Sequence, residues 1–129
     1  MHSKEIRNLN NGESDPYFVQ LLLNIKKNVP EFETIYNEDE QYLVVFQFGE
    51  FLVNNWDDKT IVKKGLDFIN EAISQGTSIT YEVIALELFT QFYNDQEKLK
   101  YIKQNLGEDA KIVLNYFELL YNKSYPRLT

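Results

Sequence analysis

Apolar residues recur every three to four positions along most of this chain, which is the spacing of one face of an α-helix. The first run follows Asp15-Pro16, a pair typical of a helix start. It ends before Pro30, because proline disfavours helical geometry in the residue that precedes it. These signals predict a first helix built on the following apolar positions: Phe18, Leu21, Leu22 and Ile25.

The next run, residues 42–56, is rich in aromatic and β-branched residues and could be read as a strand. Its helical period persists for all fifteen residues, so we predict a buried second helix. The positions expected to face the core are Tyr42, Val45, Phe46, Gly49, Leu52, Val53 and Trp56. We also interpret Phe48 and Phe51 as core residues rather than as a platform for a cofactor or a base.

Four more helices are predicted after residue 56. Asp57 or Asp58 can cap the third helix, and Gly76 ends it as a left-handed stop. The fourth is apolar nearly all round at residues 83–89, which favours a central position, and a short fifth helix ends at Gly107. The sixth carries Ile112, Val113, Tyr116, Phe117, Leu120 and Tyr121. The fold class is therefore all-α: a single compact domain of about six helices, arranged as a bundle or as a short solenoid-like stack of helix pairs.

We expect the helical domain to cover residues 15–129. Residues 1–14 are rich in Asn and contain few apolar anchors, so we predict a flexible N-terminal arm there. No secretory signal can be read in those residues, and the longest apolar stretches fall short of the roughly 18 residues that cross a bilayer. These features indicate a cytoplasmic protein with no membrane contact.

Composition then limits the chemistry. The chain has 129 residues, 43% of them hydrophobic, and a formal net charge of −7, which disfavours nucleic-acid binding. It contains no cysteine, and its single histidine is His2, so thiolate nucleophiles and the usual zinc or di-iron sites are nearly excluded. Residues 37–40 lack the alternating ligands and glycine of a calcium loop. We expect no metal and no cofactor.

One carboxylate pair could do acid/base catalysis if the two groups were buried close together, namely Glu50 and Glu87 within the most apolar helices. A simpler interpretation places both on the polar faces of those helices, so we expect no catalytic residues. Gly49 and Gly65 occur in the middle of predicted helices, where glycine costs about 1 kcal/mol relative to alanine. We interpret both as points where helices cross closely.

The charge is unevenly distributed. Residues 28–58 contain eight acidic residues and no Lys or Arg, so this segment carries −8 and the rest of the chain sums to +1. Such a segment favours an electropositive protein partner, although a solvated face that keeps the protein soluble would look the same. The candidate partner-binding residues are Glu31, Glu33, Glu38, Asp39, Glu40, Asp57 and Asp58.

Four sequence segments in the stretch 42–121, about two-thirds of the chain, carry a family resemblance: Phe48-Gly-Glu-Phe-Leu52, Gly65-Leu-Asp-Phe-Ile-Asn-Glu-Ala-Ile73, Val83-Ile-Ala-Leu-Glu-Leu-Phe89 and Tyr101-Ile-Lys-Gln-Asn-Leu-Gly107. In this order they resemble a family of small, acidic, all-helical bacterial proteins with members similar to immunity proteins of polymorphic or contact-dependent toxin systems. The resemblance implies a non-enzymatic protein that binds and neutralises a cognate toxin, for which a basic nuclease would suit the acidic segment. The alternative is a helical protein-interaction or regulatory module without a toxin partner.

Overall fold

The computed structural model describes residues 15–124, and all regular structure in that range is helical. Its α-helices are α2 (Pro16–Val19), α3 (Leu21–Asn28), α4 (Gln41–Asn54), α5 (Lys59–Gln75), α6 (Ser78–Val83), α7 (Gln96–Asn105) and α8 (Glu108–Ser124). Between α6 and α7 the chain continues as a π-helical turn, η1 (Ile84–Leu88), and a 3-10 turn, η2 (Phe89–Gln91). The predicted all-α class is confirmed, whereas the predicted arm over residues 1–14 lies outside the described residues.

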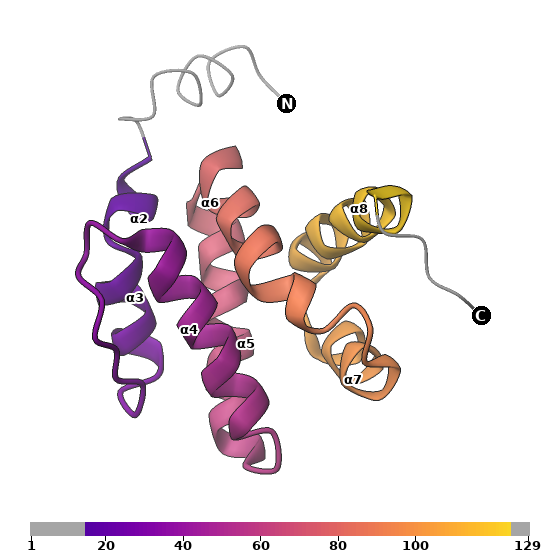
Figure 1. Cartoon of the computed structure of the whole chain (residues 1–129), viewed down its shortest axis with the longest axis horizontal. Coiled ribbons are helices and arrows are strands. Elements are labelled where there is room, and N and C mark those ends of the chain that lie inside the picture. Colours follow the sequence, from indigo (N-terminus) through magenta and orange to yellow (C-terminus); the bar gives the residue numbers. More distant parts are fainter. Residues whose placement is uncertain (1–14, 125–129) are drawn as a thin grey trace.

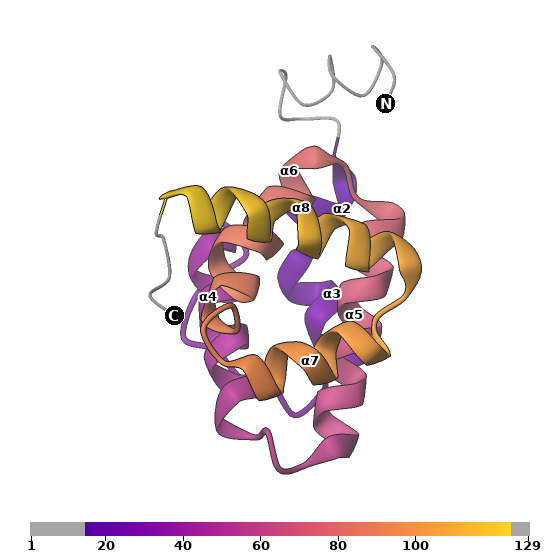
Figure 2. The ribbon, with the colours of Figure 1, turned by 90° about the vertical axis from the view of Figure 1, so that its right-hand side faces the viewer.

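The helices form three layers, which Figure 1 shows from left to right. α2 and α3 make the first layer, α4, α5 and the α6–η1 segment make the middle layer, and α7 and α8 make the third. α3 contacts both α4 and α5 on one side of the middle layer, while α8 contacts α5, η1 and η2 on the other. In Figure 2, α8 and α7 cross the middle layer one above the other. The nearly all-apolar segment 83–89 thus lies at the centre, as predicted, with Val83, Ile84, Ala85, Leu88 and Phe89 buried.

A single carboxylate joins the first layer to the middle one. Asp15 is buried, and its Oδ1 accepts the Phe18 N–H at 3.0 Å, which caps α2. Its Oδ2 accepts the Thr77 N–H at 3.0 Å, the Thr77 hydroxyl at 2.7 Å and the Thr80 hydroxyl at 2.8 Å. Burial alone would raise the pKa of Asp15, but these hydrogen bonds outweigh it and the pKa is lowered. The Asp15 carboxylate therefore holds the starts of α2 and α6 together.

The predicted first helix is interrupted at Gln20, where the backbone leaves helical geometry (φ −118°, ψ 27°). The side-chain amide of Gln41, at the start of α4, donates to the Val19 carbonyl at 3.1 Å. The Gln20 N–H turns back to the carbonyls of Tyr17 and Phe18. A contact with α4 thus replaces part of the local hydrogen bonding, so α2 and α3 form two short helices.

The buried face of α4 differs from the prediction. Gln41, Val44, Val45, Phe48, Gly49 and Leu52 are buried, whereas Tyr42 and Phe46 are each 41% exposed. The interpretation of Phe46 as a core residue is therefore wrong. The side chain of Phe32, from the loop before α4, covers Phe48 instead, with ring centroids 5.2 Å apart. Because this loop packs on one flank of α4, the core face is rotated toward Phe48.

Close packing occurs at Gly65, as predicted, but Gly76 is not a left-handed stop. A Cβ at Gly65 would lie 2.7 Å from Cδ2 of Leu52, so α4 and α5 can approach only because this side chain is missing. At Gly76 φ is −87°, and a Cβ would lie 2.5 Å from the Cβ of Thr80. The chain continues in extended form from Gly76 to Thr77, where the Thr77 N–H just before α6 donates to Asp15.

Candidate functional site

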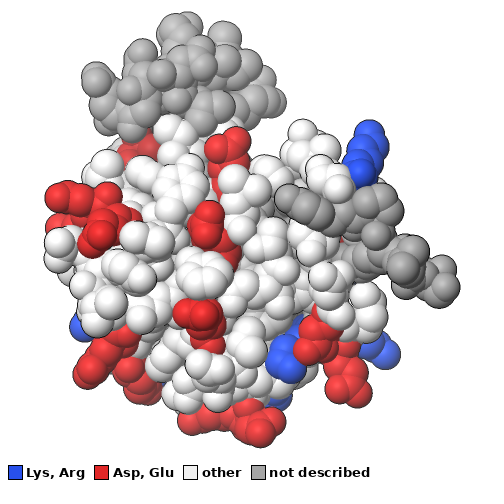
Figure 3. All heavy atoms as spheres, viewed as in Figure 1, with Lys and Arg blue, Asp and Glu red and all other residues white. Residues whose placement is uncertain are grey.

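The seven acidic residues selected from the sequence lie in two groups at opposite ends of α4. Five belong to the loop between α3 and α4, namely Glu31, Glu33, Glu38, Asp39 and Glu40, and two belong to the turn between α4 and α5, namely Asp57 and Asp58. α4 has 14 residues, so its ends are about 21 Å apart. Figure 3 shows acidic side chains along the left and lower edges of this face and also near its centre. The seven residues therefore form two separate groups rather than one compact patch.

Three of the seven have structural partners. The Glu31 carboxylate forms an ion pair with Lys64 of α5 at 2.7 Å, and the hydrogen bond from Lys64 lowers the pKa of Glu31. The Glu40 carboxylate accepts the Asn37 N–H at 2.9 Å, and Asp58 caps α5 through the N–H groups of its first turn. The segment's charge is thus partly neutralised by a lysine from α5, which the sequence pattern did not place there.

The other four are available for an external partner. Glu33, Glu38, Asp39 and Asp57 are exposed, and none of them forms an ion pair with another residue between 15 and 124. Exposed carboxylates without a neighbouring cation create a negative field that is weakened only by salt. We call Glu33, Glu38 and Asp39 the acidic loop.

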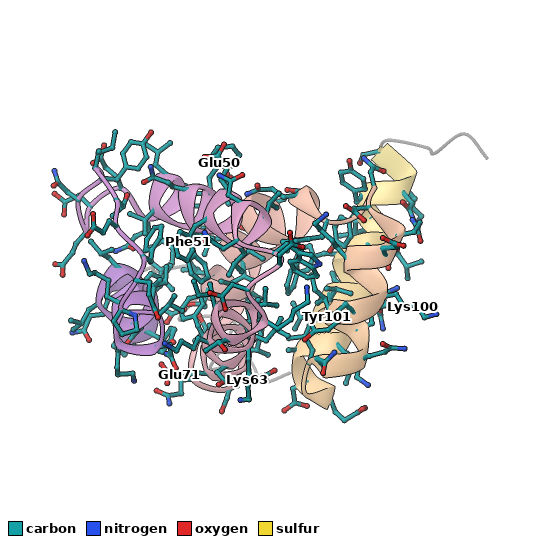
Figure 4. All side chains as sticks on the ribbon, turned by 90° about the horizontal axis from the view of Figure 1, so that it is seen from below. Glu50, Phe51, Lys63, Glu71, Lys100 and Tyr101 are labelled. Atoms are coloured by element: carbon teal, nitrogen blue, oxygen red, sulfur yellow. The ribbon has the colours of Figure 1, made fainter. Side chains whose placement is uncertain are left out.

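The hypothetical catalytic pair is not assembled. Figure 4 shows Glu50 on the outer side of α4, where it points into solvent. Glu87 lies half-buried on η1, and burial raises its pKa. Because Glu50 is exposed, the two do not form the buried pair that acid/base catalysis would require. The described residues also contain no group of three or more His, Cys, Asp or Glu that could hold a metal ion.

A groove runs between the α6–η1 segment and α8. It consists of two hollows of about 650 and 350 Å³ that share Glu82 and Phe117 in their walls. The larger is lined mainly by apolar and aromatic side chains of η1 and α8, including Leu86, Leu120 and Tyr121. We call this feature the apolar groove; concave surfaces lined in this way are typical binding sites.

Sequence reasoning missed this groove, because it treated Ile112, Tyr116 and Leu120 only as part of the apolar pattern of the last helix. All three are exposed, at 66%, 57% and 42% respectively, and only the adjacent stripe that includes Leu114 and Ala110 is buried. The signal was present: six predicted apolar positions on α8 span a wider arc than one packing partner can cover. No described element packs on the outer side of that arc, so part of it remains exposed.

The aromatic residues at the end of α4 have a structural role. Trp56 is half-buried and contacts Phe92 and Tyr101, with ring centroids 5.6 and 5.5 Å apart. Figure 4 shows Tyr101 between α7 and the middle layer. The Lys59 ammonium lies 4.3 Å from the Trp56 ring and 4.8 Å from the Tyr101 ring, in cation–π geometry. This cluster attaches α7 to the α4–α5 turn.

The described part of the chain is therefore an all-α domain with two candidate interaction surfaces, the acidic loop and the apolar groove. None of its helices is both long enough and apolar enough to cross a membrane. Comparison of the chain with protein-family models, with curated proteins and with solved structures finds no match.

Proposed function

We propose that the protein is a non-enzymatic immunity protein of a bacterial cell, which binds and neutralises a cognate electropositive toxin, such as a basic nuclease, in the cytoplasm. The observation that carries this proposal is the acidic loop, whose carboxylates are exposed and have no cation among the described residues. A basic substrate cleft would attract these carboxylates over a distance, and close charge pairs would then slow dissociation. The inhibitor would occupy the cleft in place of a phosphate backbone.

The way in which the loop is held supports this role. Phe32 is fully buried against the rings of Phe48 and Phe51, so the start of the loop is anchored in the core. Farther along, the Gln41 amide donates to the Glu38 carbonyl. A loop fixed at both ends loses little conformational freedom on binding, which favours affinity.

The first test is a search for a neighbouring gene that encodes a secreted toxin, followed by co-expression of the toxin's C-terminal domain with this protein. We expect the wild-type protein to protect cells and to associate rapidly with the toxin at low salt. Replacing Glu33, Glu38 and Asp39 with Lys should slow association by about tenfold or more and flatten its salt dependence. This triple variant leaves Glu40 in place, because that carboxylate holds the loop backbone.

The matched control reverses three exposed charges on the third layer, Glu97, Glu108 and Asp109, and should change association much less. If this control loses protection while the loop variant keeps it, the binding face lies on α7 and α8. If the wild-type protein neither binds the neighbouring toxin nor protects cells, the immunity role is wrong.

A second candidate function is a helical protein-interaction or regulatory module without a toxin partner. The observation that favours it is the apolar groove with its exposed rim. Binding through the groove that is insensitive to charge reversal in the acidic loop would favour this second function over the first.

A further inference from the structure

The rim of the apolar groove exposes large apolar side chains on both walls. Leu86 of η1 is 50% exposed, and Tyr116 and Leu120 of α8 are also exposed. Exposed apolar residues that line a common hollow indicate a binding surface, whereas single ones scattered over a surface do not. Glu82 and Phe117 line both hollows, so the two hollows are neighbours along α8.

The charge in the groove has one sign. Its lining includes Glu82 and Glu87 but no Lys or Arg among the described residues. Neither carboxylate forms an ion pair within residues 15–124. An occupant that combines apolar groups with adjacent positive charge would satisfy both features, whereas an anionic membrane surface would be repelled.

The length of the groove matches a helix. Its lining positions on α8 run from Ile112 to Ser124, which corresponds to about 18 Å of helix at 1.5 Å per residue. The opposite wall contains the π-turn η1, whose extra residue changes the direction of the following side chains, and such turns occur often at functional sites. In η1, Leu86 is exposed and Glu87 half-buried at the groove, while Ile84 and Leu88 remain in the core.

We propose that the apolar groove binds an amphipathic α-helix of a partner protein that carries Lys or Arg beside its apolar face. Leu86, Tyr116 and Leu120 would contact the apolar face, and Glu82 and Glu87 would pair with the cations. This inference rests on the second candidate function and names the chemistry of its partner. The acidic loop does not line the groove, so the immunity role and the groove can each fail separately.

The test uses the full chain and a fluorescein-labelled, capped synthetic peptide of about 14 residues. The peptide has Leu at helical spacing on one face and Lys on both flanks, and its partner control is a scrambled peptide of the same composition. We expect the amphipathic peptide to bind with a micromolar Kd, measured by fluorescence anisotropy. The Kd of the scrambled peptide should be at least about tenfold higher.

Two groove variants and one matched control locate the binding. Leu86→Asn with Leu120→Asn should weaken binding by about tenfold or more, because both exposed anchors are lost. Glu82→Gln with Glu87→Gln should weaken it about three- to tenfold and reduce its salt dependence. Glu38→Gln with Asp39→Asn removes the same net charge outside the groove and should leave binding within about twofold. Circular dichroism checks that each variant keeps the wild-type fold.

Several results would overturn the proposal. These are equal binding of the scrambled peptide, an equal loss of affinity in the control variant, or no saturable binding at about 1 mM peptide. If the wild-type protein sediments as a dimer and the Leu86/Leu120 variant as a monomer, a second copy of the chain occupies the groove instead. Residues 125–129 of the chain carry one cation, Arg127. If Arg127→Ser tightens peptide binding tenfold, that segment occupies the groove instead.

Discussion

The buried side chain of Asp15 stabilises the starts of two helices that lie far apart in the sequence. Its carboxylate accepts four hydrogen bonds, from the backbone N–H groups of Phe18 and Thr77 and from the hydroxyls of Thr77 and Thr80. Thr77, which precedes α6, makes no side-chain cap of its own. The start of α6 therefore depends on a residue that lies 62 positions earlier in the chain.

Asp15→Ala should lower the free energy of unfolding by about 2–4 kcal/mol, because it removes the cap of α2 and leaves the donors of Thr77 and Thr80 without their acceptor. Urea denaturation followed by circular dichroism measures the change. The control is Asp95→Ala, which removes the cap of α7 and a partly exposed ion pair with Lys98 and should cost about 1 kcal/mol. Equal losses in the two variants would contradict the double role of Asp15.

Stability should also depend on pH through Asp15 and Glu71. Burial alone would raise both pKa values, but hydrogen bonds to Asp15, and those from Tyr17 and Lys27 to Glu71, lower them in the folded state. A depressed folded pKa stabilises the protein above the unfolded pKa, and this contribution is lost as the pH falls through the folded value. We expect the free energy of unfolding to fall as the pH drops from about 5 to 3, and to fall less steeply in Asp15→Asn.

The rotated core face of α4 gives a further prediction at the scale of single residues. Phe48 is fully buried and contacts the rings of Phe32 and Phe68, so Phe48→Ala should cost about 3–5 kcal/mol. Phe46→Ala, on the exposed face, should cost less than about 1 kcal/mol. Thermal melts of the two variants compare these losses, and a larger loss for Phe46→Ala would contradict the orientation of α4.

At the scale of elements, the segment from α6 through η2 shows why a continuous apolar helix became irregular. In η1 and η2 the backbone leaves the α-helical hydrogen-bond pattern. Side chains donate hydrogen bonds to some of the backbone carbonyls there instead. The Thr90 hydroxyl donates to the Leu86 carbonyl at 2.7 Å, and the Gln91 amide donates to the carbonyls of Glu87 and Phe46 at 2.8 and 3.0 Å. Gln91 thus also connects this segment to α4.

The crossing of α4 and α5 depends on the pair Gly65 and Leu52. Gly65→Val should cost about 1–3 kcal/mol, since a Cβ there meets the Leu52 side chain. Leu52→Ala should cost about 2–5 kcal/mol by leaving a cavity. Chemical denaturation of the double variant should show a loss at least about 1 kcal/mol smaller than the sum, because the new side chain fills that cavity. Strict additivity would mean that the two residues do not meet.

At the scale of the whole molecule, the three layers leave the acidic loop and the apolar groove on different elements. The loop precedes α4, and the groove lies between the α6–η1 segment and α8. Both are supported by apolar packing, and the described residues contain no candidate metal cluster.

The far-ultraviolet circular dichroism spectrum should be dominated by helix, and it should stay the same when EDTA is added. The physical reason is that the buried apolar side chains of all three layers form one continuous cluster. A melting temperature that falls in EDTA, or a strong strand signal, would contradict this account. The measurement is a pair of thermal melts with and without chelator.

Much of the helical organisation followed from residues close together in the sequence. Asp15, Asp58 and Asp95 accept N–H groups in the first turns of α2, α5 and α7, and the apolar period marks each long helix. The predictions that Phe46 is buried and that Gly76 is a left-handed stop were wrong. The first depends on how the loop before α4 packs, and the second on the hydrogen bond from Thr77 to the distant Asp15. For the candidate site, the acidic residues were readable in advance, whereas the apolar groove was not.

The sequence by itself determined that residues 15–124 are largely helical, where α2 and α5 begin, and that the negative charge is concentrated in residues 28–58. These properties follow from the residues themselves and from interactions that are local in the sequence, namely helix capping, the apolar period and the formal charges of the side chains. Tertiary structure decided which face of α4 is buried, that Lys64 neutralises Glu31, and that Leu86 and Leu120 line one groove. Those outcomes depend on which helices pack against each other across the core. Helical periodicity specifies which face of a helix is apolar, but not which helix packs on that face.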